Sequence, residues 1–330
     1  MNNNKITFVV LAYNHEDYIE ECLQSIEQQT IKVYELIISN DASQDKTKNK
    51  IDDFIKKSSI PNITFLDNKE NIGLIKSINA CLNVASGDLI LLQAGDDASH
   101  PTRAEITKMH FSKTKCKVLY SSYQIMDKDS MILKTKIRNS EINDPAHFIV
   151  KGAAIPPFGT AFTRYFLTRL GTINEKIKNE DDYIGMAAVV YGGLLVIPDI
   201  LYKYRIHSRS LSSWNSIKIE SNIFLKKYFH DQANRVENYL AWRSMIEENF
   251  PSKENITSIA TREKLLQLIN KKINIKICTM NLQESNFTTR IGVLILNFNA
   301  ANLQDIIILT LGSSGILLIK WARRKILRVG

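Results

Sequence analysis

The chain has 330 residues, of which 44% are hydrophobic and 23% are charged, and its formal net charge is +9. This length allows one large domain or two ordinary ones, and the composition excludes a disordered, collagen-like or low-complexity chain. The four cysteines form no C-x-x-C pair, which excludes a disulfide scaffold and indicates a reducing compartment.

The amino terminus leads directly into a short apolar stretch, residues 6–11, without the small-residue cleavage site of a signal peptide. No run of about 18 apolar residues occurs in the chain, so we expect no membrane-spanning helix. The sequence therefore predicts a cytoplasmic protein, or one that is peripheral on the inner face of the cell membrane.

The positive charge is unevenly distributed. Residues 1–200 contain 23 Lys and Arg against 25 Asp and Glu, a net −2, whereas residues 201–330 contain 20 against 9, a net +11. A near-neutral body with a basic final third points to an anionic partner, either nucleic acid or a membrane surface.

The first 100 residues alternate strand and helix signals. The predicted strands are Ile6–Leu11, Glu35–Ser39, Ile63–Leu66 and Asp88–Leu92. The intervening predicted helices are one that Asn14 opens as N-cap, then Lys46–Lys57 and Gly73–Ala85. Successive strand–helix units imply right-handed crossovers and a doubly wound parallel sheet, which binds ligands at the carboxyl ends of its strands.

Polar clusters follow three of these strands, as this rule requires. They are Tyr13-Asn14 after the first strand, Asn40–Ser43 after the second and Gly95–Asp97 after the fourth. We expect the three clusters to meet at one edge of the sheet.

The rest of the chain gives weaker signals. They predict a helix after Pro101, a strand over Val118–Tyr123, a hairpin turn at Asp127–Ser130, a strand over Thr160–Thr163, a helix over Glu180–Tyr191 and two short strands within Leu194–Arg205. From about residue 212 the pattern is helical and basic.

Asp96 and Asp97 lie on a glycine-led loop, and paired carboxylates suit a hard cation such as Mg²⁺ or Mn²⁺ that neutralises a diphosphate. The residues alone equally allow a solvated loop or a helix cap before Pro101. Asp41 could accept hydrogen bonds from a base or ribose, or could cap the following helix. The chain lacks both the G-x-G-x-x-G and the P-loop patterns, which argues against a dehydrogenase and a P-loop NTPase.

Two later clusters also admit two interpretations. Glu180-Asp181-Asp182 either provides a general base or only complements the dipole of the helix it opens. In Tyr204–Arg209, Arg and His side chains suit phosphate or metal, although such a segment can also be a solvated basic loop.

Taken in order, these clusters resemble family 2 of the inverting glycosyltransferases, which have the GT-A fold. The resemblance covers roughly residues 5–212. The matching segments are Val9–Asn14, Asn40–Asp45, Asn71–Gly73, Gly87-Asp88, Ala94–Asp97, Gly171 with Asn179–Asp181, and Tyr204–His207.

The resemblance implies an α/β catalytic domain with a mostly parallel sheet over residues 1–211, and a helical basic region over 212–330. The nucleotide-sugar half would be about 1–100 and the acceptor half about 101–211. The implied donor-binding residues are Ala12, Tyr13, Asn14, Asp41, Asn71, Gly73, Lys76 and Asp96.

The resemblance also implies a mechanism. Asp96, Asp97 and His207 would hold Mg²⁺ or Mn²⁺, and the diphosphate would contact Arg205, His207 and Arg209. Asp181, with Glu180 beside it, would act as the general base on an acceptor hydroxyl, which attacks the anomeric carbon in line.

Two positions depart from the family pattern, since Asn40 and Ala94 replace the first Asp of their motifs. They leave Asp41 to contact the nucleotide and Asp96 with Asp97 to bind the cation. They also motivate the alternative that the chain is a non-catalytic nucleotide-sugar-binding module.

The basic tail completes the sequence-based predictions. Residues 306–319 are apolar and residues 320–325 carry Trp321 among cationic side chains, which suits either an interfacial helix on anionic lipid or a helix packed on the protein. Membrane binding fits a glycan or lipid-linked acceptor. We expect no nucleic-acid partner, because the tail lacks the interleaved aromatic side chains of a stacking platform.

Overall fold

The computed structural model describes residues 4–142, 144–151, 159–177, 180–208, 221–249 and 256–281. These residues divide into two compact units. The first unit draws on residues 1–143, 153–175 and 184–210, and the second on residues 144–152, 176–183 and 211–330. Each unit is described by itself.

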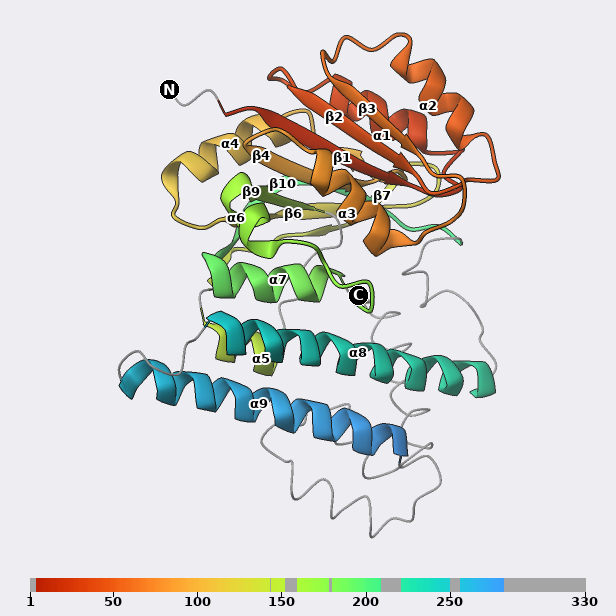
Figure 1. Ribbon diagram of the computed structural model, residues 1–330. Helices are drawn as coiled ribbons and strands as arrows, with labels where there is room; N and C mark the ends of the chain where they lie inside the picture. The colour runs from red at the N-terminus through yellow and green to blue at the C-terminus, as the bar shows by residue number, and fades with distance from the viewer. Residues whose placement is uncertain are drawn as a thin grey trace. The chain divides into compact units, whose positions relative to one another are not determined.

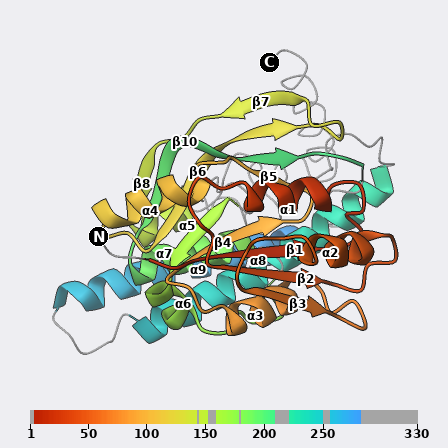
Figure 2. The same ribbon diagram turned by 90° about the horizontal axis from the view of Figure 1, so that it is seen from above.

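The first unit is built on one sheet in the order β3-β2-β1-β4-β9-β6-β10-β5, with β7 beside β6 and β8 beside β10 (Figures 1 and 2). The strands are β1 (Ile6–Ala12), β2 (Glu35–Asn40), β3 (Ile63–Asp67), β4 (Leu89–Ala94), β5 (Ala98–Ser99), β6 (Val118–Met126), β7 (Ile132–Lys136), β8 (Ser140–Ile142), β9 (Thr160–Thr163) and β10 (Leu194–Arg205). The four strands predicted in the first 100 residues are confirmed, and β1, β2, β3 and β4 are parallel to one another.

The sheet is mixed, because β9 is antiparallel to both β4 and β6. β9 therefore lies between β4 of the first half and β6 of the second, although it is far from both in the chain. β6 and β10 then pair in parallel. A local pattern can identify β9 as a strand but cannot show where it inserts.

Helices cover both faces of the first four strands. The helices of the chain are α1 (Ile19–Glu27), α2 (Thr47–Ile55), α3 (Leu74–Val84), α4 (Arg103–Lys113), α5 (Pro145–Lys151), α6 (Arg164–Leu170), α7 (Glu180–Tyr191), α8 (Ser221–Asn249) and α9 (Ile256–Asn281). α3 packs against β1 and β2. Because strands buried on both sides need apolar residues at every position, β1 is a continuous apolar run apart from Thr7.

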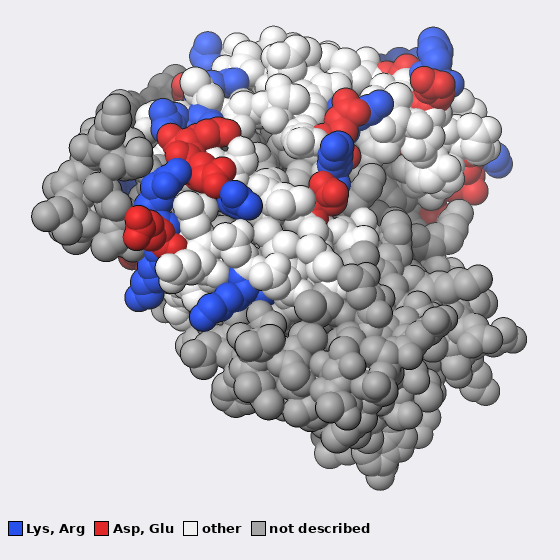
Figure 3. Space-filling model, turned by 60° about the horizontal axis from the view of Figure 1, so that its bottom comes forward, with Lys and Arg blue, Asp and Glu red and all other residues white. Residues whose placement is uncertain are grey.

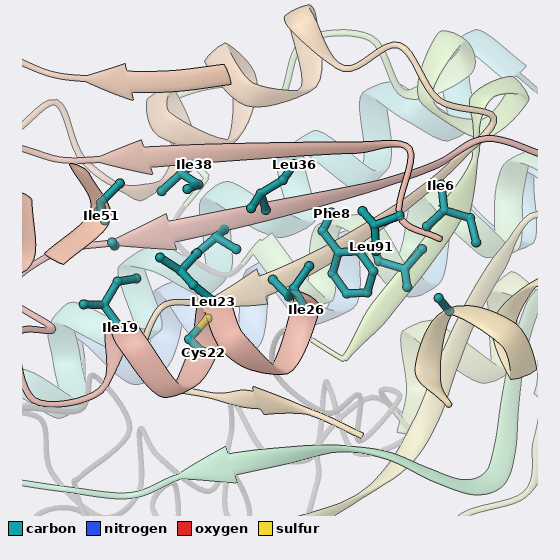
Figure 4. Close-up of a cluster of buried hydrophobic side chains, with 14 of the residues drawn as sticks. Ile6, Phe8, Ile19, Cys22, Leu23, Ile26, Leu36, Ile38, Ile51 and Leu91 are labelled. Atoms are coloured by element: carbon teal, nitrogen blue, oxygen red, sulfur yellow. The ribbon is translucent and has the colours of Figure 1, made fainter. Parts of the chain in front are cut away.

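The core on the α1 face shows how sequence spacing becomes packing. Ile19, Leu23 and Ile26 recur at helical spacing along α1, and all three are fully buried. They meet alternate residues of β1, including Phe8, in one apolar cluster (Figure 4). Removing side chains of this kind from a core costs about 2–5 kcal/mol each, so this cluster is a major source of stability for the first four strands.

β10 differs from the two short strands predicted for residues 194–205, since it is one strand of 12 residues. Its pairing with β6 shifts register between Ile197 and Ile200 and again before Tyr202. Pro198 lies in this irregular stretch, and proline cannot donate a ladder hydrogen bond. The irregularity thus interrupts the local pattern without ending the strand.

The second unit contains α5, α8 and α9. α9 packs against both α8 and α5. Trp242 of α8 lies at the centre of the aromatic contacts, with its ring 5.5 Å from Phe148 and 5.1 Å from Tyr239. The described helices of the chain include none that is long and apolar enough to cross a membrane.

On the face shown in Figure 3, acidic and basic side chains of the described residues are interspersed. This mixture agrees with the near-neutral charge of residues 1–200. The apolar segment 306–319 and the cationic segment 320–325 lie outside the described residues.

Gly87 provides a test of the packing at the start of β4. A Cβ at this position would overlap Thr7 Oγ1 and would lie 2.8 Å from the backbone oxygen of Lys5. The Thr7 hydroxyl cannot move freely, because it accepts the Gly87 N–H and donates to Glu35 Oε2 at 2.6 Å. We therefore expect Gly87→Ala to lower the free energy of unfolding by about 1–3 kcal/mol in urea titrations.

The matched control is Val84→Ala, which shortens a side chain that is 41% exposed at the end of α3. We expect a change within about 0.5 kcal/mol for this variant. Equal stability of Gly87→Ala and the unchanged protein would contradict the proposed close approach.

Candidate functional site

The polar clusters that follow β1, β2 and β4 meet at one edge of the sheet, as predicted. In the parallel register, Ala12 at the end of β1 pairs with Asn40 of β2, and the preceding Leu11 pairs with Ala94 of β4. The loops after these three strands therefore leave the sheet at the same level. This edge is the candidate site.

Hydrogen bonds lock the loops after β1 and β2 together. The Asn14 N–H donates to Ser43 Oγ at 2.9 Å, and Asn14 Oδ1 accepts the Gln44 N–H at 2.8 Å. The His15 N–H donates to Thr47 Oγ1 at 2.8 Å. The prediction that Asn14 is a helix N-cap is wrong: α1 begins at Ile19, and Asn14 has φ 55, a left-handed conformation that asparagine tolerates.

Asp41 is 7% exposed and organises the next loop. Its Oδ1 accepts the Ile72 N–H at 2.8 Å and its Oδ2 accepts the Gly73 N–H at 2.9 Å, immediately before α3. Asn68 Nδ2 donates to the same carboxylate at 3.0 Å. Gly73 has φ 85, which favours glycine. Asp41 thus holds the 71–73 loop at the end of β2.

The presence of Asn at position 40, where the family pattern has Asp, has a structural reason. Asn40 is buried, and its Nδ2 donates to Asp67 Oδ1 at 2.8 Å. An aspartate at this position would place a second carboxylate against Asp67, and adjacent carboxylates repel each other. The amide therefore suits its surroundings in this chain.

Asp96 lies between two histidines. Its Oδ2 is 3.0 Å from His207 Nε2 and 3.8 Å from His15 Nε2. Burial raises the pKa of Asp96, but the hydrogen bond with His207 and the electrostatic interactions with His15 and His207 outweigh that effect, so the pKa of Asp96 is lowered. Asp96 is therefore held as a carboxylate at the edge of the sheet.

Asp97 is 1% exposed, and its two carboxylate oxygens differ in their hydrogen bonding. Its Oδ1 accepts the backbone N–H of Arg205 at 2.8 Å, whereas its Oδ2 is buried and has no hydrogen-bond partner among the described residues. Burial and the adjacent Asp96 carboxylate raise the pKa of Asp97 well above its usual value. A buried carboxylate oxygen without a donor is where a cation would relieve an electrostatic cost.

The carboxylates of Asp96 and Asp97 fit an Mg²⁺ or Mn²⁺ ion that is also bound by a substrate. Among the described residues, no three His, Cys, Asp or Glu side chains form a ready-made metal centre. Mg²⁺ usually binds through one or two carboxylates together with substrate phosphates and water, so Asp96 and Asp97 can supply the protein's share.

Arg205 braces this loop. Its Nε donates to the Asp96 backbone oxygen at 2.7 Å, and its other two nitrogens donate to Ser130 Oγ at 2.9 Å and to Glu21 Oε2 at 2.5 Å. The guanidinium is 1% exposed and lies over the Tyr18 ring at 4.7 Å. Since every guanidinium nitrogen has a protein acceptor, this geometry favours a positioning role over diphosphate contact.

A buried polar network under the loop was not predicted from the sequence. Arg103 donates to Gln93 Oε1 at 2.9 Å, to Ser99 Oγ at 3.1 Å and to the Leu92 oxygen at 2.8 Å. Gln93 Nε2 in turn donates to the Asp97 backbone oxygen at 3.3 Å. Burial lowers the pKa of Arg103 to about 10. Nothing in the local sequence distinguishes this arginine from an exposed helix residue.

The remaining predicted donor residues differ in exposure. Tyr13 is 45% exposed, whereas Ala12 is buried. Asn71 is exposed, and Lys76 Nζ lies 3.3 Å from Glu175 Oε2 in a half-exposed ion pair. Arg209 lies outside the described residues.

The predicted general base lies in the first turn of α7, which contains Glu180, Asp181 and Asp182. Glu180 is 9% exposed, and burial raises its pKa to about 7. Burial also raises the pKa of Asp182, opposed by the charge of Arg235. A carboxyl group that titrates near neutral pH has the property required of a general base.

Residues 7–166 match Glycosyl transferase family 2. An uncharacterized glycosyltransferase of Haemophilus influenzae is 27% identical over 85% of this chain and 97% of its own length. The Escherichia coli protein WfaP, a UDP-Glc:alpha-D-GlcNAc-diphosphoundecaprenol beta-1,3-glucosyltransferase, is 28% identical over 63% of this chain and 80% of its own length.

Two solved structures share the fold. S. aureus TarS in complex with UDP-GlcNAc superposes with a TM-score of 0.60 at 17% identity, covering 93% of this chain and 81% of TarS. A mannosyltransferase from Pyrobaculum calidifontis in complex with GDP-Man and Mn²⁺ gives a TM-score of 0.55 at 15% identity, covering 98% of this chain and 83% of the mannosyltransferase. The predicted GT-A fold is confirmed by these neighbours.

The titration of Glu180 predicts how stability changes with pH. The folded protein holds the proton to about pH 7, whereas the unfolded chain releases it near the ordinary value of 4.5. Between these values the folded state binds more protons, so stability falls as the pH rises, by up to about 3 kcal/mol from this group. We expect Glu180→Gln to lose less unfolding free energy than the unchanged protein between pH 5 and pH 8 in urea titrations.

The control for this experiment is Glu175→Gln, which changes a carboxylate that is 62% exposed. Its pH dependence should match that of the unchanged protein. Parallel curves for all three proteins would contradict the assignment of a buried, proton-binding Glu180.

Proposed function

Because this chain belongs to Glycosyl transferase family 2 through residues 7–166 and is a glycosyltransferase, we propose that it transfers a sugar from a nucleoside-diphosphate sugar to an acceptor hydroxyl with inversion. We propose residues 1–211 as the catalytic domain. The observation that carries this proposal is the Asp96-Asp97 pair at the carboxyl end of β4, in which Asp96 is partly buried and Asp97 is buried, with one Asp97 oxygen that has no donor among the described residues.

The donor is proposed to bind along the edge where the loops after β1, β2 and β4 meet. Tyr13 offers an exposed ring for contact with the base, while Asn14, Asp41 and Gly73 hold the surrounding loops in place. The solved neighbours in complex with UDP-GlcNAc and GDP-Man support a nucleotide sugar as the donor. A rigid edge reduces the entropy that binding would otherwise cost.

The cation is proposed to be Mg²⁺ or Mn²⁺ held by Asp96 and Asp97, with His207 next to Asp96. Such a cation stabilises the negative charge that develops on a diphosphate leaving group. The Mn²⁺ in the mannosyltransferase from Pyrobaculum calidifontis supports this choice. Arg205 contributes by fixing the loop through the Asp96 oxygen and the Asp97 carboxylate.

Asp181 is proposed as the general base, with Glu180 next to it in the same helical turn. Removal of the acceptor proton makes the hydroxyl oxygen a nucleophile, and attack in line with the leaving group inverts the anomeric centre. The buried Glu180, whose pKa is raised to about 7, supports proton transfer in this turn near neutral pH.

The acceptor is proposed to be a glycan or a lipid-linked sugar. WfaP, which the chain resembles over most of its length, is described as acting on a diphosphoundecaprenol-linked acceptor. The basic region 212–330 is proposed to bring the enzyme to the membrane surface where such an acceptor lies.

The donor and cation proposals predict a specific stabilisation. Mn²⁺ together with UDP-linked or GDP-linked sugars should raise the melting temperature of the unchanged protein, since ligands that bind only the native state stabilise it. Asp97→Asn should lose most of this shift. Without ligands, the melting temperature of Asp97→Asn at pH 8 should be equal to or higher than that of the unchanged protein. The reason is that the buried Asp97 carboxylate is costly to ionise.

The panel includes each nucleotide sugar with and without Mn²⁺, measured by thermal unfolding, and product formation is followed in parallel. Absence of a shift with every donor would contradict nucleotide-sugar binding. An unchanged Mn²⁺-dependent shift in Asp97→Asn would contradict the metal assignment alone.

Asp181→Asn should reduce transfer by at least about a hundredfold and leave donor binding intact, because the amide keeps the shape but cannot accept the proton. Transfer is measured by product formation and binding by the thermal shift with donor. Asp199→Asn, which changes a half-exposed carboxylate beside His110, serves as the control. Near-normal turnover of Asp181→Asn would disprove the base assignment.

A further inference from the structure

The hairpin of β6 and β7 exposes an unusual set of apolar side chains. Met131 is 66% exposed, Leu133 62% and Ile137 68%, which are the highest fractions for large hydrophobic residues in the described part of the chain. Ile132 is also exposed. Figure 2 shows β7 at the outer edge of the sheet, on the side opposite β3. Apolar side chains gathered on one exposed element mark an interaction surface.

The same segment is basic. Residues 128–138 contain four basic side chains and one acidic side chain, a net +3, within a body whose first 200 residues have a net −2. Lys128 pairs with Asp129. Among the described residues, no carboxylate lies within ion-pair distance of Lys134 or Lys136, so both charges are available to an anionic partner.

The edge of β7 is poorly suited to pairing with a strand of another molecule. Its register with β6 shifts between Ile125 and Met126, which marks a bulge, and Lys134 and Lys136 lie along the strand. Bulges and lysines on an edge strand oppose the addition of a further strand. Apolar side chains, combined with lysines that have no ion-pair partner in the described part of the chain, instead match a lipid surface with anionic headgroups.

The hairpin is fixed to the candidate site. Arg205 Nη1 donates to the Asp127 oxygen at 3.1 Å and to Ser130 Oγ at 2.9 Å, in the turn between β6 and β7. Ser130 Oγ donates to Glu21 Oε2 of α1 at 2.9 Å. Arg205 is also the residue that binds Asp97 through its backbone N–H. A surface that binds this hairpin would therefore lie close to the Asp96-Asp97 loop.

We propose that the β6–β7 hairpin, residues 127–138, docks the protein on an anionic phospholipid bilayer. Met131, Leu133 and Ile137 enter the interface between headgroups and acyl chains, and Lys134 and Lys136 contact the lipid phosphates. This docking needs neither donor nor acceptor, so its failure would leave the proposed transfer reaction untouched.

The first experiment is sedimentation of the full chain with vesicles of phosphatidylcholine, with and without phosphatidylglycerol. We expect binding that requires phosphatidylglycerol. Replacing the three exposed apolar residues with serine should weaken it at least about tenfold, because their burial in the interface drives binding. The test variant is Met131→Ser/Leu133→Ser/Ile137→Ser. The control variant, with exposed apolar residues of other elements replaced, is Val84→Ser/Met109→Ser/Tyr165→Ser.

A charge variant tests the electrostatic part separately. Lys134→Gln/Lys136→Gln should weaken binding at least about tenfold at low salt, since each lysine near an anionic surface contributes roughly a factor of five. The difference should shrink at high salt. The control is Lys113→Gln/Lys115→Gln, which changes two exposed lysines at the end of α4 and just beyond it. Binding unchanged in both the apolar and the charge variant would overturn the proposal.

A fluorophore at a single position shows which surface contacts lipid. This measurement does not depend on the folding of the serine and glutamine variants. A polarity-sensitive fluorophore is attached to Leu133→Cys or, as control, to Met109→Cys, each combined with Cys278→Ser. Cys22, Cys81 and Cys116 are buried and react slowly. We expect anionic vesicles to shift the emission to the blue at position 133 only.

Two results would overturn the assignment of this surface. One is sedimentation with vesicles while the fluorophore at position 133 is unchanged, which would place the contact elsewhere in the chain. The other is a dimer in light scattering that the apolar variant converts to a monomer with no loss of vesicle binding, which would assign the hairpin to a second copy of the chain.

Discussion

Two adjacent carboxylates lie at the end of β4, Asp97 buried and Asp96 partly buried, and the surrounding structure compensates the repulsion between them. The two are treated differently. Asp96 is kept ionised by His207 and His15, whereas Asp97 has a raised pKa and receives one backbone N–H from Arg205. This asymmetry leaves one buried oxygen for a cation. The carboxylates can be held there because a buried network supports their loop: Gln93 donates to the Asp97 backbone oxygen, and Arg103 donates to Gln93.

Residues of the family's motifs hold the loops of the candidate site in place. Asp41 accepts a backbone N–H just before α3, and Asn14 accepts one from the loop after β2. Arg205 donates to the β6–β7 turn and so joins it to the site. Because these side chains hold neighbouring loops, substituting them would move the site as well as remove a contact. The same Arg205 contacts join the exposed, basic hairpin to the loop of Asp96 and Asp97, so the proposed membrane surface and the candidate site are linked through one side chain.

Much of the fold could be predicted from local patterns, since strands buried on both faces and helices with one apolar face leave clear signals. The first four strands and the helix Glu180–Tyr191 were located in this way. The antiparallel insertion of β9 and the irregular course of β10 were not, because pairing between distant segments leaves no local pattern. Asn14 was misassigned because a helix cap and a left-handed loop residue favour the same side chain.

The sequence by itself determined that polar clusters follow parallel strands, and hence that Asp41, Asp96 and Asp97 gather at one edge. Strand direction alone requires this. Only the tertiary structure decided what each group does there: that Asn40 donates to Asp67, that Arg205 is buried and holds the loop, and that one Asp97 oxygen has no donor among the described residues. These properties depend on burial and on partners that are up to 184 residues apart in the chain, and no local spacing encodes them.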